Sequence, residues 1–104
     1  MSKIGLWENA EPGVKRCILH AEGNLMMMEV QFEAGAEGYE HSHPHEQMSR
    51  CLYGRIEFRI DGKATVVEKG GVIYIPPNAK HGVTALEPSA LLDIFTPVRE
   101  DLLK

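Results

Sequence analysis

A chain of 104 residues, 43% hydrophobic and 25% charged, has the size and composition of one folded domain. Its formal net charge is −4, and the acidic and basic residues are interspersed, so no basic run indicates a nucleic-acid surface. No lysine-rich amphipathic helix and no apolar run of membrane-spanning length occurs. We therefore expect no nucleic-acid partner and no membrane partner.

The cellular location is predicted from the N-terminal residues and the cysteines. The first nine residues contain no apolar segment of the kind that a signal peptide carries. Cys17 and Cys51 are far apart and form no CxxC pair, so reduced thiols are expected. These features predict a cytoplasmic protein.

Short alternating strands are predicted along the first third of the chain. Residues 3–7 form a short edge strand, and a turn at Pro12 and Gly13 leads to a second strand over residues 14–21. In this second strand, alternation places Cys17 on the face opposite Ile18. A third strand covers residues 25–33, and its apolar face consists of Met26, Met28, Val30 and Phe32.

The rest of the chain continues this pattern after a glycine-rich connection at residues 34–38 and a histidine-rich stretch. Further strands are predicted over residues 48–53, 55–60, 63–67, 72–75, 81–86 and 90–95, and the C-terminal tail has room for one helical turn. Asp61 and Gly62 are typical of a tight hairpin turn. Many short strands with glycine and proline punctuation predict an all-β sandwich or barrel whose interior can hold one ligand.

A group of histidines lies near the middle of the chain. His41 and His43 are two residues apart, so in an extended segment both side chains point the same way, and Gln47 keeps the same parity. Histidine is the commonest metal ligand, so a metal site is predicted, against the alternative of ordinary surface or core histidines. His45 follows Pro44 and is expected behind the ligands or in solvent.

Two spaced motifs give this pattern a family likeness. The spacing Gly35-x5-His41-x-His43-x3-Gln47-x6-Gly54 resembles the first signature of the cupin superfamily, with Gln47 where most members carry glutamate. The spacing Gly70-x5-Pro76-x-Asn78-x2-His81 resembles the second signature, with Asn78 replacing the usual glycine and Ala85 the usual terminal asparagine.

The resemblance implies a single cupin domain over residues 1–104, folded as a double-stranded β-helix, or jelly-roll barrel. Its core would cover about residues 25–96, with N-terminal edge strands within 3–21 and a short tail at 97–104. Together with the need to cover exposed sheet edges, the resemblance favours a homodimer.

The resemblance also implies a set of metal ligands, namely His41, His43, Gln47 and His81. Three imidazoles and a neutral oxygen donor suit a divalent transition metal such as nickel, zinc, iron, manganese or cobalt. Because all four ligands are neutral, the metal would keep its full charge and attract anionic oxygens more strongly than a site that contains glutamate.

A closer resemblance lies in the C-terminal segment. Asp93-Ile-Phe95-Thr-Pro-Val-Arg99, together with His-Ser-His-Pro-His-Glu-Gln, resembles the pectin-degradation cupins of the KdgF type. That family acts on 4,5-unsaturated monouronates released from pectin and alginate, and promotes their opening to linear keto forms. The resemblance implies a sugar-acid substrate and an isomerase-type reaction carried by Asp93, Phe95 and Arg99.

The residues themselves fit such a role, although plainer alternatives exist. Strand parity places Asp93 beside Phe95 on one face, where burial would raise the pKa of the carboxyl and a nearby cation would lower it. Such a group can move protons, and arginine is suited to a bidentate grip on a carboxylate. Alternatively, Asp93 accepts hydrogen bonds from a backbone cap or pairs with an arginine, and it has no part in the chemistry. Phe95 would then be an ordinary core residue. Arg99 would pair with an acid such as Glu100 or Asp101.

Two other functions compete with the uronate reaction. The first is a cupin dioxygenase that uses iron, manganese or nickel, and oxygen uptake would identify it. The second is a non-catalytic module that binds a small molecule without turnover. Cys51 shares strand parity with Gln47, and a buried inert thiol is predicted there rather than a nucleophile.

Overall fold

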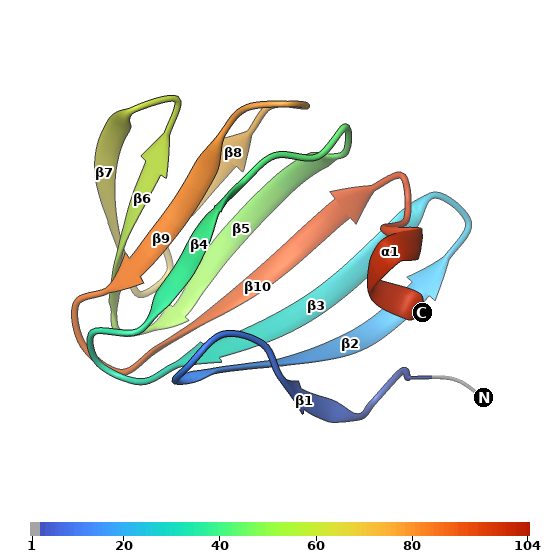
Figure 1. Cartoon of the computed structure of the whole chain (residues 1–104), viewed down its shortest axis with the longest axis horizontal. Helices are drawn as coiled ribbons and strands as arrows, with labels where there is room; N and C mark the ends of the chain where they lie inside the picture. Colours follow the sequence, from blue (N-terminus) through green and yellow to red (C-terminus); the bar gives the residue numbers. More distant parts are fainter. Residues whose placement is uncertain (1–2) are drawn as a thin grey trace.

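The computed structural model describes residues 3–104 and consists of two antiparallel sheets with one short helix. The six-stranded sheet has the order β1-β2-β3-β10-β5-β8, and the four-stranded sheet has the order β4-β9-β6-β7 (Figure 1). The elements are β1 Trp7–Asn9, β2 Val14–Glu22, β3 Leu25–Phe32, β4 Glu37–His41, β5 Glu46–Tyr53, β6 Arg55–Ile60, β7 Lys63–Glu68, β8 Val72–Ile75, β9 His81–Ala85, β10 Ser89–Thr96 and α1 Glu100–Leu103. The all-β prediction is confirmed.

The core lies between the two sheets because each sheet turns its apolar face inward. In β3 the predicted face of Met26, Met28, Val30 and Phe32 is buried, and the outward residues between them are more exposed. From the other sheet, Ile56 and Phe58 of β6 are almost fully buried in the same cluster. Period-two alternation thus builds one shared core.

Strand β10 lies inside the six-stranded sheet, and its position determines which inward side chains come together. It lies between β3 and β5 and pairs antiparallel with both. This register puts Asp93 opposite Ser49 and Phe95 opposite Gln47. The inward face of β10 therefore comes next to the inward face of the strand that follows the histidine stretch.

The N-terminal strand differs from the prediction. Residues 3–6 form a turn, closed by the Leu6 amide donating to the Lys3 carbonyl with Gly5 at a φ of 84°, and β1 begins only at Trp7. The expected strand over residues 3–7 is therefore wrong, although β1 does lie at the edge of the six-stranded sheet.

The predicted opposition of Cys17 and Ile18 in the second strand is confirmed, because Cys17 pairs with the outward Glu29 and Ile18 with the inward Met28. A register shift between Ile18 and His20 then places His20 opposite the outward Met27, so His20 does not share the inward face of Ile18. An irregularity of this kind adds a residue to one strand only, so simple alternation fails across it.

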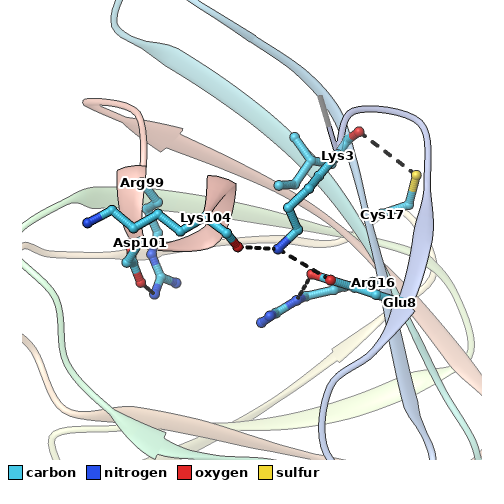
Figure 2. Close-up of polar contacts among 8 residues, drawn as sticks. Lys3, Glu8, Arg16, Cys17, Arg99, Asp101 and Lys104 are labelled. Atoms are coloured by element: carbon cyan, nitrogen blue, oxygen red, sulfur yellow. Dashed lines mark hydrogen bonds and ion pairs between the residues drawn. The ribbon is translucent and has the colours of Figure 1, made fainter. Parts of the chain in front are cut away.

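The predicted helical turn near the C-terminus is confirmed as α1, which buries Leu102 against the core. A chain of polar contacts joins this end to the N-terminal segment: Lys3 Nζ donates to the Lys104 carbonyl and pairs with Glu8, which also accepts from Arg16 Nε (Figure 2). Among the residues from Lys3 onward, no helix has the length and apolar character needed to cross a membrane.

Gly54 gives a sharp test of the fold. It has a φ of 86°, and a Cβ there would collide with Ser89 Oγ and the Pro88 carbonyl. An alanine at this position would have to adopt a left-handed backbone conformation, and its Cβ would also overlap its neighbours. Because the two costs add, Gly54→Ala is expected to lower the free energy of unfolding by roughly 3 kcal/mol or more. Gly62 has a φ of 82° but open space around it, so Gly62→Ala should cost only about 1–2 kcal/mol. Urea unfolding compares the two, and equal losses would contradict this packing.

Candidate functional site

Three histidines from separate parts of the chain converge between the sheets. His41 ends β4 and lies opposite His81, the first residue of β9, while His43 lies in the bend before β5. The His41 ring centroid is 4.3 Å from that of His81, and the His43 and His81 centroids are 4.9 Å apart. One candidate ligand atom from each histidine lies within 4.8 Å of the others, so the group could hold a metal ion.

Backbone carbonyls set the orientation of all three rings. The Nδ1 atoms lie 2.9 Å from the Tyr39 carbonyl for His41, 3.2 Å from the His45 carbonyl for His43 and 3.0 Å from the Ala79 carbonyl for His81. A carbonyl only accepts hydrogen bonds, so each Nδ1 carries a proton, and in the neutral ring the lone pair is then on Nε2. His81 Nε2 is buried and has no hydrogen-bond partner among the described residues, which fits a metal ligand.

Gln47 points its carbonyl oxygen at this group. Its Nε2 donates to Ser49 Oγ at 3.0 Å, and Ser49 Oγ donates to Asp93 Oδ1 at 2.6 Å, which leaves Gln47 Oε1 facing His43 Nε2 at 3.0 Å. Since Nδ1 of His43 holds the proton, two lone pairs face each other across that gap. A cation coordinated by both atoms removes this conflict, so the donor set fits a divalent metal.

The environment of His43 and His81 keeps these two imidazoles neutral. Burial, reinforced by Arg99 and His81, lowers the pKa of His43 to about 4. Burial also lowers the pKa of His81, against the opposing hydrogen bond to the Ala79 carbonyl. Neutral imidazole is the form that coordinates metals, so this site is prepared for an ion at neutral pH.

Asp93 is a buried carboxyl at the inner end of this hydrogen-bonded chain. It is 6% exposed, and burial raises its pKa to about 6, while the Ser49 hydrogen bond and the charge of Arg99 lower it. A carboxyl with this pKa exchanges protons readily near neutral pH. The alternative of a charge fully paired with an arginine does not hold, because its hydrogen-bond partner is Ser49.

Arg99 lies between an aromatic ring and an acid. Its guanidinium carbon is 5.3 Å from the centroid of Phe95, and its NH2 donates to Asp101 Oδ2 at 2.7 Å (Figure 2). The predicted pairing with Asp101 is thus observed. The Nε atom is nevertheless buried without a hydrogen-bond partner in the described part of the chain, so Arg99 keeps donor capacity for another group.

These side chains share one cavity of about 350 Å³. Its lining includes His41, Gln47, His81, Asp93, Phe95 and Arg99, together with apolar residues of β3 such as Met28 and Val30. His43 is not part of the lining, although its ring lies 5.8 Å from that of Phe95. A cavity of this size, apolar with a few convergent polar groups, suits a small molecule.

Phe95 has both of the roles that the sequence left open. It is 1% exposed and belongs to the core cluster, and it also forms part of the cavity wall. Cys51 is fully buried in the core and lies outside the lining, and burial raises the pKa of its thiol. The prediction of a buried thiol is therefore confirmed, and its raised pKa disfavours the nucleophilic thiolate form.

Two residues of the site were missed by reasoning from the sequence. Ser49, which joins Gln47 to Asp93, has the same strand parity as Gln47, so alternation alone would have placed it on the inner face. Arg16 lines the cavity from β2, where Glu8 accepts from its Nε at 2.9 Å. No motif singles out Arg16, because its position follows only from the pairing of β2 with β3.

Comparisons with a family model, with a characterised relative and with solved structures lead to the same family. The cupin domain model matches residues 28–95. The pectin degradation protein KdgF of Dickeya dadantii is 37% identical over 99 residues, which cover 93% of this chain and 90% of the relative. The structure of KdgF from Halomonas sp. has a TM-score of 0.89 at 35% identity and covers 93% of this chain and 90% of that one.

A second solved structure agrees with these matches. An RmlC-like cupin from Shewanella frigidimarina also has a TM-score of 0.89 at 35% identity, with 93% of this chain and 87% of that chain covered. The sequence and the fold thus lead to the same relatives. The chain belongs to the cupin family and is a homologue of the pectin degradation protein KdgF.

Proposed function

We propose that this chain is a metal-dependent cupin enzyme that converts 4,5-unsaturated monouronates, from pectin or alginate breakdown, to their linear keto forms. The observation that carries the proposal is the hydrogen-bonded chain from the buried Asp93 through Ser49 and Gln47 to the three-histidine group, inside a cavity that also contains Arg99. The names of the relatives, pectin degradation protein and KdgF, support the substrate class.

In this proposal His41, His43, Gln47 and His81 hold a divalent transition metal, and nickel, zinc, iron, manganese and cobalt all suit the donors. When bound, such an ion supplies Lewis acidity that stabilises negative charge on a substrate oxygen. Gln47 has a second role, because its amide hydrogen bond to Ser49 links the metal site to the carboxyl that moves protons.

Asp93 is the proposed acid and base. Opening the ring converts the C1 hydroxyl to a carbonyl, breaks the bond from C1 to the ring oxygen and leaves an enol over C4 and C5. Ketonisation then adds a proton to C4, so the overall change is an isomerisation. A carboxyl with a pKa of about 6 can accept the hydroxyl proton and return a proton to carbon.

Arg99 is the proposed anchor for the uronate carboxylate. Asp101 holds its NH2 group, which fixes the guanidinium over Phe95 and leaves the buried Nε available. Arginine binds carboxylates through fixed, directional donors, and Phe95 beneath it forms the apolar wall that keeps the substrate in place.

Arg99→Gln is expected to raise KM by about 10- to 100-fold with a smaller change in kcat, because a charge-assisted hydrogen bond to the substrate is lost. Steady-state kinetics on the unsaturated monouronate measures both constants. Arg55→Gln is the matched control, since Arg55 pairs with Glu68 on the surface and lies outside the cavity lining. A fall in kcat alone at Arg99 would contradict an anchoring role.

Product analysis separates the proposed reaction from its two rivals. Proton NMR of the metal-loaded protein with unsaturated monouronate should show the linear keto form appearing faster than in buffer, without oxygen uptake. Oxygen consumption coupled to substrate loss would instead identify a dioxygenase. Tight binding of the uronate without conversion would identify a binding module.

Other expectations from the sequence remain proposals. We propose a cytoplasmic location, which the two free, buried cysteines support because reduced thiols are the rule in that compartment. We also propose the division into a core at about residues 25–96, N-terminal edge strands within 3–21 and a tail at 97–104. The homodimer likewise stays a proposal.

A further inference from the structure

Arg16 is a charged side chain on the inward face of β2. Its register partner is Val30, which is buried on the inward face of β3, and Arg16 itself lines the cavity that contains the candidate metal ligands. A charge at an inward position is costly unless it has partners. The proposed ring opening leaves this arginine without a role, so we asked what its free donors could bind.

Glu8 holds one edge of the Arg16 guanidinium. Glu8 Oε1 accepts from Arg16 Nε at 2.9 Å, and Glu8 Oε2 pairs with Lys3 Nζ at 3.3 Å (Figure 2). The hydrogen bond from Arg16, with a smaller contribution from Lys3, lowers the pKa of Glu8, so its carboxylate stays charged at neutral pH. The Arg16 terminal nitrogens donate to no group between Lys3 and Lys104. The arginine is thus held in place with two donors left for a ligand.

Arg16 and Arg99 lie at different levels along the cavity. The inward residues of β10 follow in the order Leu91, Asp93 and Phe95. The Arg99 guanidinium lies over the Phe95 ring, at one end of this series. The registers of β2 with β3 and of β3 with β10 put Arg16 level with Leu91, at the other end. A ligand whose carboxylate is bound at Arg99 therefore passes Asp93 and presents its far end to Arg16.

Two acids in the cavity lining indicate that this far end carries hydroxyls rather than a second carboxylate. Glu11 and Glu40 line the same cavity as Arg16. They would repel a second carboxylate, but they can accept hydrogen bonds from hydroxyl groups. A hydroxyl both donates and accepts, so a ring with neighbouring hydroxyls suits a cavity that offers arginine donors together with carboxylate acceptors.

We propose that Arg16 donates to the C2 hydroxyl of the sugar acid and to a hydroxyl next to it, while Arg99 holds the carboxylate. This inference rests on the proposed function and adds a second anchor to it. In a hexuronate ring the carboxylate is attached to C5, and C2 is the ring carbon directly across from C5. Arg16 then fixes the far side of the ring, and Glu8 is the residue that positions Arg16.

C2 is also the carbon at which the two kinds of substrate differ. Unsaturated monouronates from pectin and from alginate have opposite configurations at C2, because galacturonate and mannuronate do. A donor directed at this hydroxyl makes a different contact with each configuration, and site groups that bind a substrate hydroxyl discriminate strongly. Arg16 is therefore the residue through which this cavity distinguishes the two substrates.

Equilibrium binding tests this contact without turnover. The probes are galacturonate, whose saturated ring carries hydroxyls, and cyclohexanecarboxylate, which keeps the carboxylate and a six-membered ring but has no hydroxyl. In the metal-loaded protein, Arg16→Met should weaken galacturonate binding on the order of 10-fold and leave cyclohexanecarboxylate binding within about twofold. Arg99→Gln should weaken the binding of both probes, because both present a carboxylate. Isothermal titration calorimetry gives the dissociation constants.

Two further variants complete the binding test. Arg55→Met is the matched control, because Arg55 pairs with Glu68 outside the cavity lining and should bind both probes as the parent protein does. Glu8→Ala keeps Arg16 but removes the acid that holds it, so it should lose part of the galacturonate affinity and none of the cyclohexanecarboxylate affinity. Circular dichroism and thermal unfolding establish that each variant is folded.

Kinetics with the two unsaturated monouronates tests the specificity. Arg16→Met should change the ratio of kcat/KM for the pectin-derived substrate to that for the alginate-derived substrate on the order of 10-fold. Arg55→Met should leave this ratio as it is in the parent protein.

Three results would overturn the inference. These are equal weakening of both probes by Arg16→Met, unchanged galacturonate binding by that variant, and an unchanged ratio for the two substrates. Galacturonate binding that depends on Arg16 in a protein without turnover would reject the proposed reaction alone. Full turnover of the parent protein with galacturonate binding indifferent to Arg16 would reject this inference alone.

Discussion

His81→Ala is expected to lose bound metal and to reduce kcat/KM on the order of 100-fold or more. His81 is 4% exposed and lies within contact distance of both other histidine rings, and its Nε2 has no other partner in the described chain. Substitution of a residue that only hydrogen-bonds to a metal ligand typically lowers metal affinity or activity about 10- to 100-fold. Removal of the ligand itself should lower them at least as much. Metal analysis of the dialysed protein and initial rates measure the two effects.

His20→Ala is the control for this variant. His20 lies on the exposed surface of β2 and pairs with Glu22, away from the three-histidine group. It should keep the metal content and the rate of the parent protein. Retention of stoichiometric metal and normal turnover by His81→Ala would show that the histidine group is not the metal site.

Asp93→Asn is expected to lower kcat by roughly 10²- to 10⁴-fold, the usual contribution of a positioned acid or base. Asparagine has nearly the same shape, and its carbonyl oxygen can still accept the hydrogen bond from Ser49. Bound metal and the affinity for substrate should therefore change little. The measurements are kcat, metal content and the substrate Kd of the same preparation.

Asp61→Asn provides the matched change at an exposed turn. The Asp61 carboxylate accepts a hydrogen bond from the Lys80 backbone amide. The backbone φ of Asp61 is 48°, a conformation that asparagine also adopts readily. Its turnover should equal that of the parent. If Asp93→Asn turned over at the parental rate, Asp93 would be a structural residue and the proton path would have to be sought elsewhere in the cavity.

Much of the fold is predictable from the sequence because alternation and turn residues act locally. The inward faces of β3 and β6 follow from a period of two, and the ends of the strands follow from glycines and prolines. His81 is far from the histidine stretch in sequence, and only the paired motifs of the resemblance bring it into the predicted ligand set. The structure then places it opposite His41.

Other features depend on contacts between distant segments and leave no local signal. The irregularity in β2 and the turn at residues 3–6 are invisible to a pattern of alternation. The link from Gln47 through Ser49 to Asp93 requires the register of β5 against β10. The pairing of Arg99 with Asp101 depends on where α1 begins, which is why the sequence left it as one of several alternatives.

The central claim is tested most directly by the rate at which unsaturated monouronate loses its ultraviolet absorbance. Freshly generated substrate is mixed with metal-loaded protein and compared with buffer and with His81→Ala. We predict faster loss with the parent protein and the uncatalysed rate with the variant. A parent protein that binds metal at the histidine group yet leaves the rate unchanged would contradict the assignment of this cupin to uronate ring opening.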